Sequence, residues 1–114
     1  MADETRVLQS IRLALGAFKH VRMFRNNTGR LKTDSGRYVD FGLCVGSSDL
    51  IGYRSTVVTP EMIGQRIAVF VAIEVKDAGN KTTPTQQAFI DRVQMDGGIA
   101  GVCRSVSEAE ELCR

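Results

Sequence analysis

The sequence is poor in the residues on which several common classes of protein depend. Its 114 residues include three cysteines, one histidine and no CxxC pair, which is too little for a disulfide framework or a cysteine zinc site. A serine-histidine-aspartate hydrolase would have only His20 to use. We therefore expect Cys44, Cys103 and Cys113 to be buried thiols in a reducing compartment.

Long apolar runs and nucleotide-binding motifs are also missing. No hydrophobic segment approaches the roughly 18 residues needed to span a membrane, and the N-terminal residues are unlike a secretory signal. We therefore expect a cytoplasmic protein. No GxxxxGK[ST] or GxGxxG pattern occurs, which argues against a P-loop or dinucleotide-binding enzyme. The composition, 43% hydrophobic and 25% charged, is that of an ordinary globular protein, and the length predicts one domain over residues 1–114.

The charges are nearly balanced in number but unevenly placed. The formal net charge is +2, from 15 basic and 13 acidic residues. Between Lys19 and Arg37 the chain carries six basic residues and a single acid, Asp34. Such a segment could neutralise phosphate groups, although a solvated basic face would explain the charge equally well.

Local patterns in the first half predict one helix and three strands. Apolar residues at helical spacing indicate a helix from Glu4 to Phe18, with Asp3 as its N-cap. Strands are expected at 21–24, 38–45 and 49–53, the first two paired as a hairpin. The turn signals between them are 26–29, where Gly29 could take a positive φ, and 34–36.

The second half predicts a strand–helix–strand unit. Residues 67–73, within a strand expected at 67–75, are apolar at nearly every position, as in a central strand covered on both faces. Thr83-Pro84-Thr85-Gln86 reads as a capping box that opens a helix, which Gly97-Gly98 ends. The strand at 99–103 should then run parallel to the first. A short helix should follow Thr59, which would cap it, and a closing helix is expected over 105–113. The apolar stripe of the helix after the capping box would consist of Ala88, Phe89, Ile90 and Val93. Together these elements predict an α/β fold with one mixed sheet.

Three charged residues form the pattern that carries chemistry. Glu74 and Lys76 are two apart at the end of the predicted strand, so their side chains share a face. Asp49 follows a Gly-Ser-Ser turn, and its carboxylate could converge with that of Glu74 if their strands are neighbours. Two convergent carboxylates need a cation or a proton between them, and hard oxygen ligands select Mg²⁺ or Mn²⁺. The alternatives are a strand-end ion pair for Glu74 and Lys76, and a turn aspartate bonded to backbone N–H groups.

Three segments of the chain resemble a known nuclease family. The segments are GSSDL at 46–50, IEVK at 73–76 and QQAFI at 86–90. They are similar to the PD-(D/E)xK superfamily and, more closely, to a stand-alone virus-type VRR-NUC domain, with Ser48 in place of the superfamily's proline. The resemblance runs from about Glu4 to the segment 105–112. It implies a single-domain restriction-endonuclease-like α/β fold, with a mixed central sheet flanked by helices.

The resemblance also implies a metal-dependent DNA endonuclease and its ligands. By position, Asp49, Glu74 and the backbone carbonyl of Val75 would bind Mg²⁺ or Mn²⁺. Glu4 matches a first-helix glutamate that many members carry, although stabilisation of the helix dipole explains it equally well.

Two further residues match the family's catalytic positions. Lys76 would be the catalytic lysine, and Gln86 the helix glutamine that helps to build the active site. The capping box with Thr83 is an alternative reading of Gln86, and the two roles are compatible.

The segment after the first predicted strand would contact DNA. Its glycine turn, with Asn and Thr donors and flanking arginines, suits a phosphate backbone, although an ordinary hairpin loop has the same composition. The basic footprint would continue through Lys19, Arg22 and Arg37. The expected DNA-binding residues are Arg25, Asn26, Asn27, Thr28, Arg30 and Lys32.

Family likeness further implies a homodimer that cuts branched DNA such as Holliday junctions, in a bacterial cell and encoded by the host or by a phage. A two-fold dimer would present two active sites to a symmetric junction. Apolar residues that could form the dimer surface are Val57, Val58, Met62 and Ile63. The alternatives are a non-catalytic module that binds branched DNA, and a nuclease for flap, nicked or duplex DNA.

Overall fold

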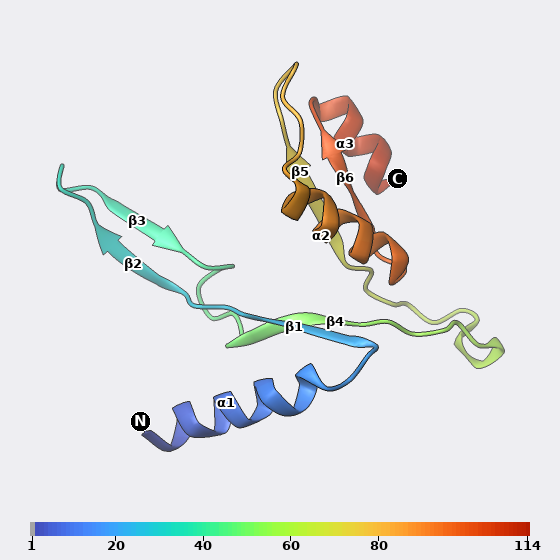
Figure 1. Ribbon diagram of the computed structural model, residues 1–114, viewed down its shortest axis with the longest axis horizontal. Coiled ribbons are helices and arrows are strands. Elements are labelled where there is room, and N and C mark those ends of the chain that lie inside the picture. Colours follow the sequence, from blue (N-terminus) through green and yellow to red (C-terminus); the bar gives the residue numbers. More distant parts are fainter. Residues whose placement is uncertain (1) are drawn as a thin grey trace. The chain divides into compact units, whose positions relative to one another are not determined.

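The computed structural model describes residues 2–114, which form two compact units. The first unit ends at Arg54 and the second runs from Ser55 to Arg114. The described residues contain three α-helices, one short 3₁₀ helix and three two-stranded sheets, so the fold is mixed α/β (Figure 1). The expected central sheet flanked by helices is seen in part, as one parallel pair of strands with helices packed on it.

The first unit opens with a helix and an antiparallel strand pair. Helix α1 (Ala2–Gly16) contacts β1 (Val21–Arg25), which pairs with β4 (Leu50–Arg54). Asp3 lies inside the first turn of α1, so the expected N-cap at Asp3 is wrong. The expected hairpin between β1 and 38–45 is also wrong, because β1 takes β4 as its partner. Gly52 permits this pairing, since a Cβ there would collide with the backbone of Arg22.

A separate hairpin lies between these two paired strands in the sequence. Strand β2 (Gly29–Lys32), which sequence patterns do not reveal, pairs with β3 (Tyr38–Phe41), which is shorter than predicted. The turn predicted at 34–36 is confirmed, with Gly36 at φ +86°. Gly29 does not adopt the positive φ considered for it; its lack of a side chain instead makes room for the ring of Phe41.

The second unit is built on the predicted strand–helix–strand segment. Strands β5 (Val71–Val75) and β6 (Ile99–Cys103) pair in parallel, as expected, and α2 (Pro84–Met95) connects them. Helix α3 (Val106–Cys113) also packs on β6. The strand expected at 67–75 begins only at Val71. Within the described residues β5 pairs with β6 alone, and its alternate residues are exposed, so it is not the doubly covered central strand that was predicted.

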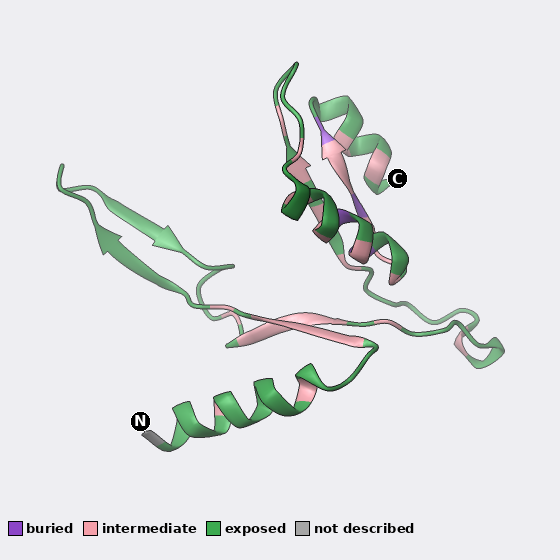
Figure 2. Cartoon of the chain, viewed as in Figure 1, coloured by how far each residue is buried: buried purple, intermediate pink, exposed green. Residues whose placement is uncertain are grey.

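The buried residues of the described chain lie in α2 and β6 (Figure 2). They are Ile90, Val93, Ala100 and Cys103. Ala88, expected in the apolar stripe of α2, is exposed. Cys44 and Cys113 are also exposed, so only Cys103 is the buried thiol that was expected.

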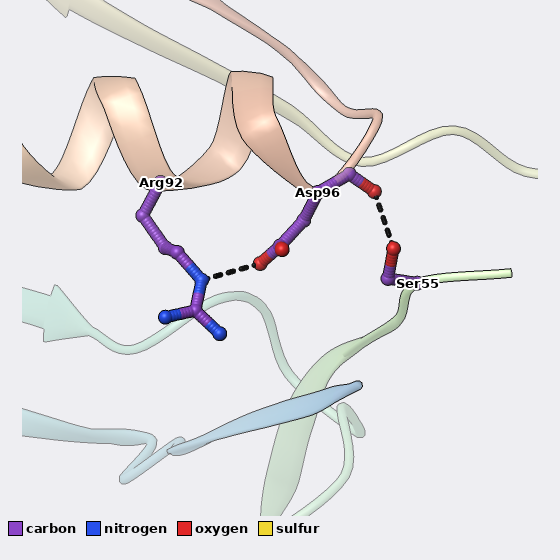
Figure 3. Close-up of polar contacts among 3 residues, drawn as sticks. All are labelled: Ser55, Arg92 and Asp96. Carbon is purple, nitrogen blue, oxygen red and sulfur yellow. Dashed lines mark hydrogen bonds and ion pairs between the residues drawn. The ribbon is translucent and has the colours of Figure 1, made fainter. Parts of the chain in front are cut away.

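Polar contacts hold both ends of α2. At its start Thr83 and Gln86 form the predicted capping box, with Pro84 in the first turn. At its end the Arg92 Nε donates to the Asp96 carboxylate at 2.8 Å, and the Ser55 hydroxyl donates to the Asp96 carbonyl at 2.7 Å (Figure 3). The capping box and the Ser55 hydroxyl satisfy backbone groups that a helix end leaves without intrahelical partners, whereas the contact of Arg92 with Asp96 joins two side chains.

A 3₁₀ helix, η1 (Pro60–Met62), follows Thr59 as predicted. The Thr59 hydroxyl makes no capping hydrogen bond to the backbone of η1. Instead, the pKa of Glu61 lies below its ordinary value because its own backbone N–H, and then the Thr59 hydroxyl, hydrogen-bond the carboxylate. The helices in the described part of the chain are all too short or too polar to cross a membrane.

Candidate active site

Asp49 stands at the entrance of β4 on ordered backbone. Its carbonyl accepts a hydrogen bond of 2.8 Å from the Asn26 N–H, directly after β1. The residue is exposed, and no donor in residues 2–114 bonds its carboxylate. The alternative in which the Asp49 carboxylate accepts backbone N–H groups of its turn is therefore not observed in the described residues. The carboxylate is available to a ligand from solvent.

Glu74 and Lys76 lie at the carboxyl end of β5. Strand alternation places both side chains on one face, and both residues are half-buried. The Lys76 N–H donates to the Cys103 carbonyl at 3.2 Å, which continues the pairing of β5 with β6 beyond Val75. Arg104, just after β6, donates to the Asn80 carbonyl at 2.7 Å and so holds the following loop.

The two side chains do not pair with one another. No ion pair joins Glu74 and Lys76 anywhere in the described chain, and neither side chain has another polar partner there. The strand-end ion pair considered from the sequence is thus not formed. Both charged groups are therefore left without a partner in the described residues, and each can interact with a bound ligand.

Gln86 brings the first turn of α2 to the same face of β5. A pocket of about 190 Å³ is lined by Glu74, Gln86 and apolar residues of β5 and α2. The Gln86 Oε1 accepts the Thr83 N–H at 2.9 Å, as a capping box requires. Its Nε2 has no partner within the described residues, so the same side chain can complete the cap and still donate a hydrogen bond.

The donor set suits a hard cation in its chemistry. Asp49 and Glu74 offer carboxylate oxygens without competing partners, and oxygen ligands are those that Mg²⁺ and Mn²⁺ prefer. Among residues 2–114 no group of three or more His, Cys, Asp or Glu side chains gathers as a ready metal cluster. Asp49 belongs to the first unit and Glu74 to the second. Their convergence therefore stays a prediction.

The β2–β3 hairpin presents a cationic face. In its register Arg30 lies opposite Asp40 and Lys32 opposite Tyr38. Arg30 makes an exposed ion pair of 2.8 Å with Asp40, and both cations lie over the Tyr38 ring, at 5.6 Å for Arg30 and 5.9 Å for Lys32. The ring and the carboxylate hold two long cationic side chains on one side of the hairpin.

The loop that precedes the hairpin has both structural and exposed residues. The Arg25 Nε donates to the Asn27 side chain at 3.0 Å, and both residues are exposed. Thr28 and Arg30 line an open groove of about 610 Å³ beside the loop 42–46. Asn26 differs, because its side chain bonds to Ser47 and Ser48. Sequence reasoning missed Ser47, since its partner lies 21 residues away.

A profile of the VRR-NUC domain matches residues 20–107, which is most of the chain. The chain belongs to the VRR-NUC family. VRR-NUC is a domain of the PD-(D/E)xK type, so the family resemblance inferred from the motifs is confirmed and the chain is a nuclease domain. No curated protein and no solved structure matches it.

The VRR-NUC match covers most of the expected site. Asp49, Glu74, Lys76 and Gln86 all fall inside it, whereas Glu4 falls outside. Glu4 is an exposed residue in the first turn of α1, where a negative charge also suits the helix dipole. Within the VRR-NUC domain the structure brings Glu74 to Gln86, and Asn26 to the backbone of Asp49. The function of each residue remains a prediction.

Proposed function

We propose that this VRR-NUC domain is a Mg²⁺- or Mn²⁺-dependent endonuclease that hydrolyses phosphodiester bonds in branched DNA, Holliday junctions among them. It would act as a homodimer in the cytoplasm of a bacterial cell. The observation that carries the proposal is the state of Asp49, Glu74 and Lys76. In a chain of a nuclease family, their charged groups lie at strand ends without partners in the described residues.

Residues 1–114 would act as one nuclease domain in which the metal is held by Asp49, Glu74 and the backbone carbonyl of Val75. Glu4 is a further candidate ligand. A bound divalent ion supplies a Lewis acid that polarises a phosphoryl oxygen and lowers the pKa of a water molecule. The fit lies in the chemistry of the donors, since carboxylate and carbonyl oxygens suit such an ion.

The chain's own cationic and amide groups would handle the scissile phosphate. Lys76 shares a strand face with Glu74, so its ammonium group can stabilise negative charge that develops on the phosphate or orient the attacking water. The free Nε2 of Gln86 lies in a residue that lines the Glu74 pocket and can donate to the same water or phosphate. Hydrolysis would leave 5′-phosphate and 3′-hydroxyl ends.

The basic loop and hairpin would bind the DNA backbone. Arg25, Asn27, Thr28, Arg30 and Lys32 are exposed and can reach phosphate groups without reading bases. A dimer would supply the second cutting centre that a symmetric junction requires. Of its candidate apolar residues, Val57, Val58 and Ile63 are at least 70% exposed.

Cleavage of a four-way junction with Mg²⁺ or Mn²⁺ tests the proposal. We expect Asp49→Asn, Glu74→Gln and Lys76→Met each to reduce the cleavage rate by about 10²-fold or more, because each removes a group that acts on the reacting phosphate. Matched controls with the same charge changes on exposed residues are Asp34→Asn, Glu110→Gln and Lys81→Met. Undiminished cutting by all three site variants would overturn the assignment.

Two other outcomes would select the alternative functions. Tight junction binding without cleavage under any divalent metal would identify a binding module that keeps the fold. Faster cutting of flaps, nicks or plain duplex than of junctions would retain the nuclease and change its substrate. The comparison requires all four substrates at equal concentration and equal salt, because phosphate contacts make affinity depend on salt.

A further inference from the structure

Asn26 uses its polar groups on the segment that leads to Asp49. Its backbone N–H donates to the Asp49 carbonyl at 2.8 Å. Its side-chain Nδ2 donates to the Ser47 hydroxyl at 2.7 Å and to the Ser48 carbonyl at 2.9 Å. Its Oδ1 accepts the Leu43 N–H at 3.0 Å. Asn26, which is half-buried, therefore bonds to the loop 43–48 both at its beginning and at its end.

Ser47 connects Asn26 to the middle of this loop through further hydrogen bonds. Its hydroxyl accepts from Asn26 and donates to the Cys44 carbonyl at 2.7 Å, while its N–H donates to the same carbonyl at 3.1 Å. Gly46 supplies the positive φ of +84° that this tight turn needs. The loop from Leu43 to Ser48 has no regular helix or strand, so these bonds are what order it.

The pattern of bonds argues against a direct DNA contact by the Asn26 side chain. Both hydrogens of its amide nitrogen are already donated within the loop. A phosphate oxygen accepts hydrogen bonds, so Asn26 has no side-chain donor left for it. Asn27, by contrast, is exposed, and its side-chain oxygen accepts a hydrogen bond from Arg25.

We infer that Asn26 is a positioning residue, which acts with Ser47 to hold the loop 43–48 so that the Asp49 carboxylate is oriented for the metal. The inference rests on the proposed role of Asp49 as a ligand. It replaces the expected DNA contact of Asn26 with a contact inside the protein. A ligand at the end of an irregular loop binds metal more tightly when the loop is already held in place before the metal arrives.

The first test uses the metal-free protein. We expect Asn26→Ala and Ser47→Ala to speed hydrogen exchange of the Leu43 amide at least tenfold, whereas Ser35→Ala leaves it unchanged. Ser35 is the matched control because its exposed hydroxyl bonds only within the 33–37 turn, to Thr33 at 2.9 Å. Unchanged exchange in both variants would overturn the inference. If Asn26→Ala does not fold, Asn26→Asp retains the acceptor for Leu43 and loses both donations, and Ser47→Ala leaves Asn26 intact.

The second test separates positioning from DNA contact. We expect Asn26→Ala and Ser47→Ala to raise the Mn²⁺ concentration for half-saturation about tenfold, measured by Mn²⁺ EPR without DNA. The cleavage rate at saturating Mn²⁺ should return to within about threefold of wild type, and junction affinity without metal should be unchanged. A loss of junction affinity with unaltered Mn²⁺ binding would make Asn26 a DNA contact and overturn the inference.

Failure of the two proposals would look different. If Asp49→Asn binds Mn²⁺ as tightly as wild type, Asp49 is not a ligand, and both its role and the positioning role are wrong. If Asp49→Asn abolishes Mn²⁺ binding while Asn26→Ala and Ser47→Ala bind it normally, only the positioning role is overturned.

Discussion

Asn26 and Gln86 each use an amide side chain, with opposite results. Asn26 donates both amide hydrogens to residues of the loop 43–48, so its role is structural. Gln86 uses its oxygen on the helix cap, and its nitrogen has no partner in the described residues. Counting donors and acceptors at a single residue therefore separates a residue that holds a site from one that can act in it.

Asp40 limits the basic face that would meet DNA. It neutralises Arg30 through an ion pair in which both side chains are more than 60% exposed. Asp40→Asn frees the Arg30 guanidinium for a phosphate, and we expect DNA affinity to rise about two- to fivefold, the range set by a surface pair of up to about 1 kcal/mol. Fluorescence anisotropy with a junction, at two salt concentrations and without metal, measures the change.

Asp34→Asn is the control for the Asp40 prediction. Asp34 is an exposed acid in the turn of the same hairpin, and no ion pair or hydrogen bond in the described chain engages its carboxylate. The Asp34→Asn substitution removes the same charge as Asp40→Asn but releases no arginine from an ion pair. Equal gains in affinity from both variants would mean that net charge, and not Arg30, decides binding.

At the scale of elements, the start of α2 joins stability to the candidate site. The capping box secures the first turn through Thr83 and Gln86, and that same turn lines the Glu74 pocket. Stability and catalysis can therefore both change when Gln86 is replaced. Two substitutions separate the two roles.

We expect Gln86→Glu to preserve the cap and impair cutting. A glutamate at this position still accepts the Thr83 N–H, so the free energy of unfolding should stay within about 0.5 kcal/mol of wild type. The lost amide donor should lower the cleavage rate about tenfold or more. Gln86→Ala should lower both, with about 1 kcal/mol of stability lost. Urea unfolding and junction cleavage measure the two effects; normal cutting by Gln86→Glu would restrict Gln86 to the cap.

The whole molecule is small for the task proposed for it. Each chain of 114 residues offers one set of Asp49, Glu74 and Lys76, so paired cuts across a junction require a second copy. The apolar residues exposed near η1 are the candidates for that contact, Ile63 among them at 83% exposure.

A mixed dimer tests this arrangement. We expect a dimer of one wild-type and one Glu74→Gln chain to nick one strand of a junction, whereas wild type cuts two. Ile63→Asp should shift the protein toward monomer in analytical ultracentrifugation, because it places a charge in the apolar contact, while Lys81→Met should leave the association unchanged. A monomeric wild-type protein that still makes paired cuts would contradict the prediction.

Sequence reasoning succeeded where neighbours in the chain decide the structure. The capping box at Thr83, the turn at Gly36 and the end of α2 at Gly97 depend on contacts within four residues. The parallel pairing of β5 and β6 followed from the helix between them. Prediction from the sequence failed for β2, because its Gly-Arg-Leu-Lys sequence has little strand character of its own and is ordered by pairing with β3.

By itself the sequence determined the capping box of α2, the turn at Gly36 and the family, because each depends on residue types at short, fixed spacings. It also singled out Asp49, Glu74, Lys76 and Gln86 by the same kind of pattern. Only the tertiary structure decided that β1 pairs with β4 across the intervening hairpin, and that Asn26 binds the loop before Asp49. Those contacts join residues 21 to 33 positions apart, and long-range pairing depends on how the whole chain closes its loops rather than on any local preference.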